Sequence, residues 1–402
     1  MTVEIRPGKA QGCLMAPTSK SMAHRYLIAA ALAKGKSVVC GIAYSQDILA
    51  TMDCLAALGV KMEQSGDAVT VWGGTPLLPM NDLLCRESGS TLRFMLPLCL
   101  LSGKEATLRG SQRLMERPLS VYEALAAEKG FTLRRDSGAV TVCGRLEAGV
   151  YEVDGSVSSQ FITGLVFALL TRKGESRIHL TGKVESRSYI DLTLDALNEF
   201  GFHVSWETEN TLCLASGEGT PREITVEGDY SNAAFFDALT LLDGTVQVKG
   251  LKEHSLQGDR IYRSYFKELA QGTPTLSLAN CPDLGPVLFA VAAALNGGVF
   301  TDTARLKIKE SDRGAAMAEE LEKCGVQVVL EENRIVVPGG QLKVPCEKIN
   351  GHNDHRIVMA MAVLLTRTGG VLEEAEAVSK SMPDFFEKLS SLGIEVKINE
   401  TK

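Results

Sequence analysis

Six glycines divide this chain of 402 residues into lengths that are nearly equal. Each of them closes an amphipathic helical segment, typically as Leu-x-x-x-Gly, and is followed by an apolar, strand-like segment. Their successive separations are 71, 71, 71, 53 and 68 residues, and they are Gly59, Gly130, Gly201, Gly272, Gly325 and Gly393. Because a fixed period of this kind marks a copied supersecondary unit, the sequence predicts six repeats of one α/β unit.

A second pattern lies between these glycines and also occurs six times. It begins with a small polar residue and a polar turn, and it continues as an apolar helix that ends at glycine. The segments are 21–35, 90–103, 159–174, 231–244, 283–297 and 354–369. The helices expected at 161–170, 284–295 and 357–365 are apolar on nearly every face, which is typical of a helix buried in the middle of a domain.

The amphipathic helices, among them 190–200 and 315–324, should lie outside the buried helices, with small sheets between the two sets. Each repeat reads as strand, helix, strand, helix, strands. We therefore expect an α/β fold in which three βαβαββ-type units surround three parallel buried helices, an inside-out barrel, to form one domain. Six units make two domains, in agreement with a chain longer than one core usually serves.

The order of the repeats predicts how the chain is shared between the two domains. The N-terminal segment precedes the first buried helix, so its repeat partner should lie near the other end of the sequence. We expect one discontinuous domain of residues 1–17 and 227–402, and a second domain of residues 18–226. The two crossings, near Thr18 and Val226, would act as hinges.

The starts of the buried helices indicate what kind of ligand the protein binds. Serine, asparagine and aspartate at these positions are good N-caps. Parallel helices would place their positive ends on one face of each domain, and two such faces across a cleft would attract anions. The pattern predicts a small polyanionic substrate in an interdomain cleft, bound by helix N-termini together with Lys and Arg side chains.

Composition argues against several other classes of protein. A net charge of −7 is unlike that of a nucleic-acid binder. The longest apolar stretch, residues 284–300, is interrupted by Gly285 and Pro286 and is a poor membrane span. Residues 1–6 have no apolar core, so we expect no signal peptide. Ten singly spaced cysteines indicate reduced thiols in a cytoplasmic protein.

His352 and His355 have the spacing of metal ligands. Only Asp354 accompanies them, with no cysteine or acidic cluster beside it. We therefore expect no metal site.

Three polar strings near the starts of helices are jointly very specific: Ser158-Ser159-Gln160-Phe161, Lys309-Glu310-Ser311-Asp312-Arg313 and Asn353-Asp354-His355-Arg356. Together with Lys20 and with Lys380 before Pro383, they resemble the 5-enolpyruvylshikimate-3-phosphate synthase family over essentially the whole chain. Members of that family have two domains built from six repeated units. The resemblance implies an enzyme of the same kind, working as a cytoplasmic monomer without a cofactor.

The implied reaction joins shikimate-3-phosphate to phosphoenolpyruvate in the biosynthesis of chorismate and the aromatic amino acids. A proton is added to the methylene carbon of phosphoenolpyruvate, the 5-hydroxyl of shikimate-3-phosphate attacks the cationic centre, and the tetrahedral adduct then loses a proton and phosphate. One carboxylic acid must deliver and recover a proton, and another must accept the proton of the hydroxyl.

The resemblance also assigns roles to residues. The expected catalytic residues are Asp283, Glu310, Lys20 and His355. The expected contacts of shikimate-3-phosphate are Lys20, Ser21, Arg25, Ser158, Ser159, Gln160, Ser186, Tyr189, Asp283 and Lys309. The expected contacts of phosphoenolpyruvate are Lys20, Gly89, Arg93, Arg117, Gln160, Arg313, Arg356 and Lys380. Most of the shikimate-3-phosphate site would belong to residues 18–226, and the acid–base residues to the discontinuous domain.

These residue types suit the task. The planar guanidinium of arginine binds carboxylates and phosphates through two hydrogen bonds, and Gly89 allows the backbone to approach a ligand closely. Several of these assignments also have a purely structural alternative. Ser21 could be a helix cap, Asp283 an N-cap carboxylate, His355 a satisfied core histidine, and Arg117 an ordinary surface arginine.

The chain departs from the family pattern at Glu87, where asparagine is usual, and at Ser188, where proline is common. Two other functions remain open. UDP-N-acetylglucosamine enolpyruvyl transferases share the fold and the donor, but they usually carry a loop cysteine, and this chain has none between Cys99 and Cys143. A non-catalytic scaffold for anionic partners would need no acid–base pair such as Asp283 with Glu310.

Overall fold

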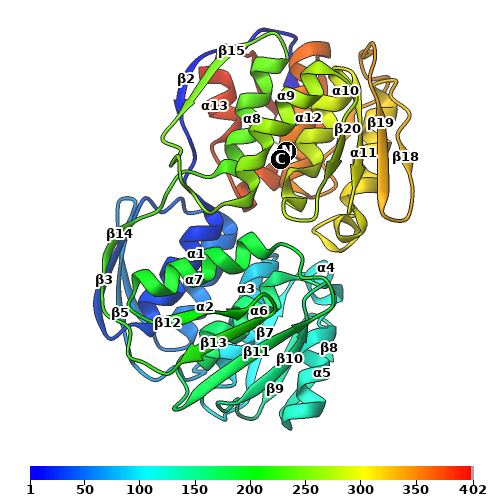
Figure 1. Ribbon diagram of the computed structural model, residues 1–402. Coiled ribbons are helices and arrows are strands. Elements are labelled where there is room, and N and C mark those ends of the chain that lie inside the picture. Colours follow the sequence, from blue (N-terminus) through cyan, green and yellow to red (C-terminus); the bar gives the residue numbers. More distant parts are fainter. Residues whose placement is uncertain (400–402) are drawn as a thin grey trace. The chain divides into compact units, whose positions relative to one another are not determined.

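The computed structural model describes residues 1–399 (Figure 1). The chain divides into two compact units, each with its own hydrophobic core. The continuous unit is Thr18–Glu227, and the discontinuous unit combines Met1–Pro17 with the segment that begins at Gly228. No helix within residues 1–399 has both the length and the apolar character needed to cross a membrane.

The continuous unit contains three four-stranded sheets, with strand orders β14-β3-β5-β4, β6-β7-β9-β8 and β10-β11-β13-β12. Its strands are β3 (Gly35–Cys40), β4 (Lys61–Ser65), β5 (Ala68–Gly73), β6 (Leu83–Arg86), β7 (Ala106–Gly110), β8 (Thr132–Asp136), β9 (Ala139–Cys143), β10 (Val150–Asp154), β11 (Glu175–Thr181), β12 (His203–Thr208), β13 (Thr211–Ala215) and β14 (Glu223–Thr225). Its helices are α1 (Lys20–Leu32), α2 (Gln46–Ala57), α3 (Gly89–Cys99), α4 (Gln112–Glu116), α5 (Ser120–Lys129), α6 (Ser159–Leu169) and α7 (Arg187–Glu199).

The three sheets of this unit share one pairing pattern. In each sheet the first two strands are parallel and the other neighbours are antiparallel. Parallel neighbours require a crossover connection. In two of the sheets a buried helix supplies it, since α3 connects β6 to β7 and α6 connects β10 to β11. One pattern in three sheets is what a copied unit produces.

Two sheets of the discontinuous unit repeat this design, with strand orders β20-β21-β1-β22 and β16-β17-β19-β18, whereas its third sheet, β15-β2, is a single parallel pair. Its strands are β1 (Thr2–Ile5), β2 (Gln11–Met15), β15 (Thr245–Lys249), β16 (Thr275–Ser277), β17 (Gly297–Thr301), β18 (Val329–Leu330), β19 (Arg334–Pro338), β20 (Ile349–Asn350), β21 (Gly370–Glu373) and β22 (Val396–Asn399). Its α-helices are α8 (Tyr230–Leu241), α9 (Tyr262–Gln271), α10 (Gly285–Ala294), α11 (Arg313–Lys323), α12 (His355–Thr368) and α13 (Phe385–Ser391). Its 3-10 helices are η1 (Gly258–Ile261), η2 (Pro282–Leu284), η3 (Ala304–Ile308) and η4 (Ala375–Lys380).

The N-terminal strands complete sheets whose other strands come from much later in the chain. β1 lies between β21 and β22 and is antiparallel to both, with Val3 opposite Leu372 and Ile398. β2 pairs with β15 in parallel, with Cys13 opposite Gln247. The first seventeen residues therefore pack within the discontinuous unit, although the whole continuous unit follows them in sequence.

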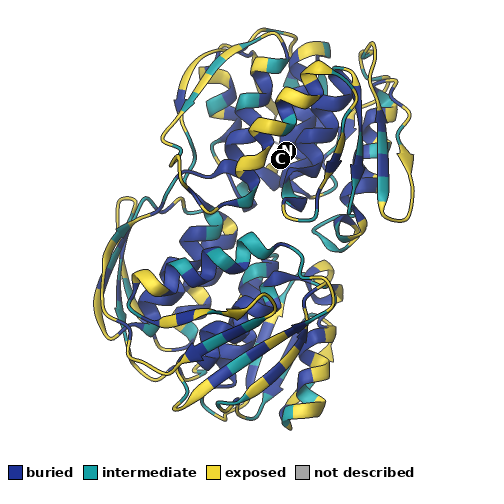
Figure 2. Cartoon of the chain, in the orientation of Figure 1, coloured by how far each residue is buried: buried dark blue, intermediate teal, exposed yellow. Residues whose placement is uncertain are grey.

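The centre of each unit is made of helices without a polar face. All ten residues of α10 are buried, and so are twelve of the fourteen residues of α12 (Figure 2). Helices α9 and α11 bury one face only, as the amphipathic pattern of their sequences requires. The hydrophobic pattern thus decides which helices form the cores of the units.

The glycines that mark the repeat also have a structural reason. Gly59 follows α2 with φ 90°, and Gly130 follows α5 with φ 75°. Such left-handed conformations are costly for residues with a Cβ, and glycine commonly occupies them at the end of a helix. Five of the six glycines adopt a positive φ of this kind, whereas Gly272 is extended, with φ 174°.

An expectation at the start of the first buried helix is wrong. The serine at the start of the first apolar segment is not the cap of its helix, because Oγ of Ser19 accepts the hydrogen bond from the Met22 amide at 3.3 Å. Ser21 therefore lies in the first turn of α1, where its side chain is not used for capping.

Candidate active site

Lys20 is the first residue of α1 and pairs with an aspartate from the next helix. Its Nζ lies 2.7 Å from Oδ2 of Asp47 in α2, and the two side chains are only 16% and 10% exposed. Asp47 was not among the predicted site residues. It reaches Lys20 through the packing of α2 against α1, so no local signal in the sequence connects them.

Arg25 lies one turn further along α1 and is buried. Its guanidinium donates hydrogen bonds to Thr193 Oγ1 at 2.9 Å, to the Ser21 carbonyl at 2.7 Å and to the Tyr189 carbonyl at 2.9 Å. All three acceptors are neutral, and burial lowers the pKa of Arg25 to about 10. The group is thus a buried cation that these neutral oxygen atoms hold at the start of α1, a suitable partner for an anion.

The starts of α3 and α6 are joined through Gln160. Nη1 of Arg93 donates to Oε1 of Gln160 at 2.6 Å, and Nε2 of Gln160 donates to Oγ of Ser90 at 2.9 Å. The Arg93 guanidinium lies 4.9 Å from the centre of the Phe161 ring, within the range of a cation–π contact. Predicted residues from two different repeats therefore form one contact network.

Gly89 and Arg117 are also in contact, in a way that the sequence did not indicate. A Cβ at Gly89 would lie 2.3 Å from Nη1 of Arg117, so a side chain at this position would displace the guanidinium from its place. Arg117 follows α4 and is 9% exposed, which excludes the alternative of an ordinary surface arginine.

The remaining predicted residues of this unit lie at helix starts. Ser158 caps α6 by accepting a hydrogen bond from the Gln160 amide at 3.3 Å, and Ser159 beside it is buried. Ser186 is the N-cap residue of α7 in a left-handed conformation, with φ 54°. Thr193 of α7 bonds Thr163 of α6 at 2.9 Å and so joins the surroundings of Arg25 to α6.

A second cluster is built in the discontinuous unit, where three helix starts meet. Nη1 of Arg356, in the first turn of α12, donates to Oγ of Ser231 in α8 at 2.6 Å. The same nitrogen donates to the backbone carbonyl of Asp283, just before α10, at 3.2 Å. The three buried helices of this unit therefore bring their N-terminal turns together, and Ser231 is a member of the cluster that the predicted set lacked.

Asp283 lies at the centre of this cluster. Its carboxylate is 3.1 Å from Lys309 Nζ, 2.9 Å from Arg313 Nη1 and 3.3 Å from Arg356 Nη2. Burial alone would raise the pKa of Asp283, but the attraction of Arg356, Lys309 and Arg313 outweighs it and holds the pKa well below the usual range. Asp283 lies in η2 and makes no capping hydrogen bond, so the N-cap alternative is excluded.

Arg313 is bound by two carboxylates. Its Nε and Nη2 donate to the two oxygens of Asp354 at 2.8 and 3.2 Å, and its Nη1 donates to Asp283. Asp354 is fully buried. Burial would raise its pKa, yet Arg313 outweighs burial and lowers it. Asp354 also accepts a hydrogen bond from the Arg356 amide at 2.9 Å and so caps α12, as expected of an aspartate at the start of a buried helix, whereas its bond to Arg313 was not predicted.

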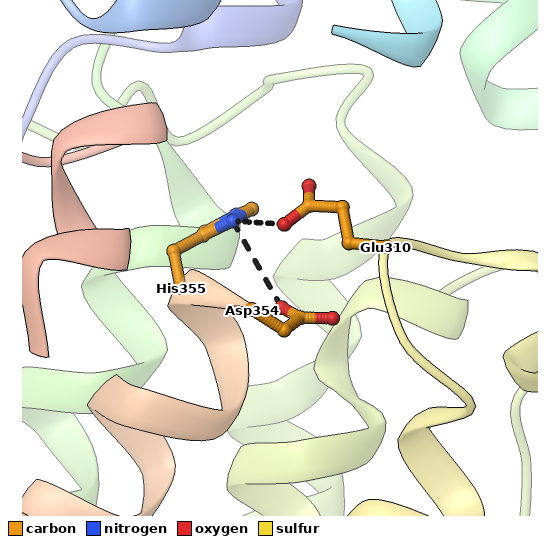
Figure 3. A group of neighbouring side chains, drawn as sticks. All are labelled: Glu310, Asp354 and His355. Atoms are coloured by element: carbon orange, nitrogen blue, oxygen red, sulfur yellow. Dashed lines mark hydrogen bonds and ion pairs between the residues drawn. The ribbon is translucent and has the colours of Figure 1, made fainter. Parts of the chain in front are cut away.

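Glu310, the second carboxylate of the cluster, is paired with the imidazole of His355 (Figure 3). Nδ1 of His355 lies 2.9 Å from Oε2 of Glu310 and 3.9 Å from Oδ1 of Asp354. The imidazole is buried, whereas Glu310 is 16% exposed. The buried His355 is thus bonded to a carboxylate that is partly exposed, an arrangement suited to proton transfer.

The ligand atoms of Glu310, Asp354 and His355 lie within 4.8 Å of one another, close enough to surround a metal ion. However, Arg313 donates to both oxygens of Asp354. A cation at this place would have to displace a guanidinium, so the donors fit acid–base chemistry better than metal binding.

Lys309 and Lys380 are the other cations of this cluster. Burial lowers the pKa of Lys309 from 10.5 to about 8. Asp283 opposes this effect, while the charges of Arg305 and Arg313 add to it. Lys380 is 6% exposed, and its Nζ donates to the Asn353 carbonyl at 2.5 Å. Both ammonium groups are held by acceptors of the protein rather than spread into solvent.

A cavity of about 390 Å³ is lined by residues that are close to this cluster in sequence, but the cavity is separate from the cluster. It is lined by η3, the start of α11 and the β18–β19 hairpin, with Lys307, Asp312 and Ile335 among its residues. Lys307 and Asp312 flank Lys309 and Glu310 in the chain, yet neither of the latter two lines the cavity. The carboxylates of Asp283 and Glu310 are likewise not part of its lining.

The structure thus gathers the predicted residues into two clusters, one in each unit.

The sequences of known proteins are similar to that of this chain over nearly its full length. A family model described as EPSP synthase (3-phosphoshikimate 1-carboxyvinyltransferase) matches residues 5–389. A 3-phosphoshikimate 1-carboxyvinyltransferase from Clostridium kluyveri is 37% identical over 418 residues, which cover 98% of each chain. Another, from Clostridium beijerinckii, is 35% identical over 422 residues, which cover 97% of each.

Solved structures share the fold. One EPSP synthase structure from Acinetobacter baumannii has a TM-score of 0.78 at 24% identity and covers 99% of this chain and 100% of its own. A second structure from the same organism has a TM-score of 0.80 at 22% identity and covers 100% of both. The predicted α/β fold is confirmed. The chain therefore belongs to the EPSP synthase (3-phosphoshikimate 1-carboxyvinyltransferase) family.

Proposed function

We propose that this chain transfers the enolpyruvyl group of phosphoenolpyruvate to the 5-hydroxyl of shikimate-3-phosphate and releases phosphate, a step of chorismate and aromatic amino acid biosynthesis. Membership of the family over residues 5–389 supports this activity. The single observation that carries the residue assignment is the cluster around Asp283. There, two carboxylates, Asp283 and Glu310, lie among Lys309, Arg313 and Arg356.

Both substrates carry a phosphate and a carboxylate, so binding requires several cations. In the continuous unit, we propose that shikimate-3-phosphate binds the residues that surround Arg25 and Gln160. These are Lys20, Ser21, Arg25, Ser158, Ser159, Gln160, Ser186 and Tyr189. Asp283 and Lys309 would complete this site from the discontinuous unit. Backbone N–H groups at the starts of α1 and α6 would add to the attraction.

For phosphoenolpyruvate, we propose cations from both clusters, with Gln160 as the shared amide. The contacts are Lys20, Gly89, Arg93, Arg117, Gln160, Arg313, Arg356 and Lys380. Nη1 of Arg313 donates one N–H to Asp283 and carries a second N–H, which would be its donor to a substrate oxygen. Each substrate would therefore draw on residues of both clusters.

Asp283 is proposed as the base that accepts the proton of the 5-hydroxyl. In the substrate-free protein its pKa is held well below the usual range, so the group is ionised near neutral pH. Such a carboxylate is a weak base while Arg356 and Lys309 surround it. When substrate anions bind these cations, their field on Asp283 weakens and its basicity rises, at the moment when the hydroxyl is in place.

Glu310 is proposed as the acid that protonates the methylene carbon of phosphoenolpyruvate. His355, 2.9 Å from its carboxylate, would stabilise the charge that Glu310 acquires. After the 5-hydroxyl has attacked, Glu310 would take back a proton from the new methyl group as the bond to phosphate breaks. Lys20, paired with Asp47 in the free protein, would contact both substrates and offset the charge of the departing phosphate.

Phosphate release tests the activity and separates it from the two alternatives. We expect release only when shikimate-3-phosphate and phosphoenolpyruvate are both present, with each omitted in turn as the control. Release with UDP-N-acetylglucosamine in place of shikimate-3-phosphate would instead favour the related transferase. Binding of shikimate-3-phosphate without any release of phosphate would favour a non-catalytic scaffold.

We further propose that the protein acts as a monomer. Light scattering in solution should then give a mass near the 43.2 kDa of one chain. A mass of twice that value at micromolar concentration would contradict the proposal.

A further inference from the structure

The loop before α12, residues 350–354, has an unusual backbone. His352 and Asn353 both have left-handed conformations, with φ 50° and φ 46°, although neither is a glycine. Such conformations are costly and persist where the surrounding contacts hold them. The loop leads directly into Asp354 and His355, so the contacts that hold the loop also place these two residues of the acid–base cluster.

Glu320 of α11 holds one side of the loop. Its fully buried carboxylate accepts the Asn350 amide at 2.8 Å through Oε2, and it bonds His352 Nε2 at 2.8 Å through Oε1. Lys323 donates to both of its oxygens, at 3.0 and 2.8 Å. Because an ammonium already occupies this carboxylate, the group is an ion-pair network and not an open site for a metal cation.

The other side of the loop is held at the Asn353 peptide groups. The Asn353 N–H donates to Oε2 of Glu374 at 2.6 Å, and the Asn353 carbonyl accepts a hydrogen bond from Lys380 Nζ at 2.5 Å. Lys380 is one of the residues proposed to bind phosphoenolpyruvate. The carbonyl of Asn353 therefore sets the direction of this ammonium, and a shift of the loop would move it.

The hold of Glu320 on His352 depends on charge. The hydrogen bond to Glu320 raises the pKa of His352 above its ordinary 6.5, while burial opposes this change. Glu320, Glu319 and Lys323, all on α11, are the charged groups that act on the imidazole. The charged groups that follow the loop, Glu374 and Lys380, bind Asn353 instead.

We propose that His352 and Glu320 are positioning residues for the phosphoenolpyruvate site. Their hydrogen bond fixes the conformation of loop 350–354. The Asn353 carbonyl then directs the Lys380 ammonium, and Asp354 stays at the start of α12. The inference rests on the proposed assignment of Lys380 to phosphoenolpyruvate. Folding raises the pKa of His352. The ionic interaction of its imidazolium with Glu320 is therefore complete at a pH below the ordinary pKa of histidine, and it is lost as the pH rises through the raised pKa.

The test uses two variants that share the same backbone cost at a left-handed position, His352→Ala and His352→Gln. At pH 6 we expect His352→Ala to raise the KM for phosphoenolpyruvate about tenfold, the factor of one pKa unit of lost interaction, with the KM for shikimate-3-phosphate unchanged. His352→Gln keeps an N–H donor for Glu320 but not the charge, so at pH 6 it should raise this KM by less than His352→Ala does.

The pH profile gives a readout that a merely structural role would not change. In the unmodified protein the KM for phosphoenolpyruvate should rise as pH passes the raised pKa of His352, and both variants should lose this rise. Glu319→Gln, which changes an exposed carboxylate 4.0 Å from the imidazole, is the matched control and should keep it. Amide hydrogen exchange of residues 350–354 should be faster in His352→Ala than in His352→Gln.

Lys380→Met, measured alongside, separates this inference from the proposed function. A normal KM for phosphoenolpyruvate in Lys380→Met would refute the assignment of Lys380, and with it the role of the loop in binding. A raised KM in Lys380→Met, together with normal KM and normal exchange in folded His352→Ala, would overturn the inference alone.

Discussion

Lys309 offers a test of the site that depends on a single proton. Burial lowers its pKa from 10.5 to about 8, and the net effect of Asp283, Arg305 and Arg313 leaves it there. We have proposed that its ammonium contacts shikimate-3-phosphate. If only the protonated form binds the anion well, the apparent affinity falls in proportion to the protonated fraction of Lys309.

The size of the effect follows from the pKa. With a pKa of about 8, roughly half of Lys309 is protonated at pH 8 and about a tenth at pH 9, so the apparent Kd for shikimate-3-phosphate should rise about twofold and about tenfold. The phosphate, with a second pKa of about 6, is already a dianion over this range. Lys309→Arg keeps its charge and should abolish the rise, whereas Lys309→Met should bind weakly at every pH.

Isothermal titration calorimetry between pH 7 and 9 measures both consequences. The Kd should follow the calculated fractions, and binding near pH 8.5 should take up a proton, seen as a heat that varies with the ionisation enthalpy of the buffer. A Kd that does not change between pH 7 and 9 would refute the reasoning. So would an equal pH dependence in Lys309→Arg, since that side chain does not titrate there.

Three further substitutions test the proposed roles. Glu310→Gln should lower kcat about 10²–10⁴-fold, as loss of an acid–base group does, with an unchanged urea midpoint; turnover at the original rate would contradict the mechanism. Arg25→Ala should raise the KM for shikimate-3-phosphate about thirtyfold while kcat is largely kept, and steady-state kinetics showing only a kcat loss would argue against a binding role. Gly89→Ala places a Cβ 2.3 Å from Arg117, so it should raise the KM for phosphoenolpyruvate about tenfold or more, and an unaltered KM would exclude Arg117 from that site.

Much of the fold could be predicted because its signals are local. Gly59 and Gly130 end helices in backbone conformations that other residues adopt at a cost, so their spacing reveals the repeat. The sequence of α10 has no polar face, so it can only form the centre of a unit. Properties of this kind depend only on the residues of one turn or one helix. The similarity to solved structures confirms the fold that they predict.

The partners of the site residues could not be predicted, because they come from other helices. Asp47 reaches Lys20 from α2, and Asp354 binds Arg313 across 41 residues of sequence. Such pairs depend on how two helices pack, and the spacing of residues along the sequence does not indicate this packing. The cap of α1 was misplaced for a different reason. Several hydroxyl groups precede that helix, and only the extended backbone of Ser19 selects the one that caps it.

The place of β1 has a consequence for how the protein is made. During synthesis β1 leaves the ribosome first, whereas its neighbours β21 and β22 are among the last segments to emerge. At about 5–20 residues per second, this strand waits roughly 20–80 s before its sheet can form. The whole continuous unit is completed during that wait. We therefore expect nascent chains from which Glu227 has just left the ribosome to hold a folded core preceded by a strand without its sheet partners.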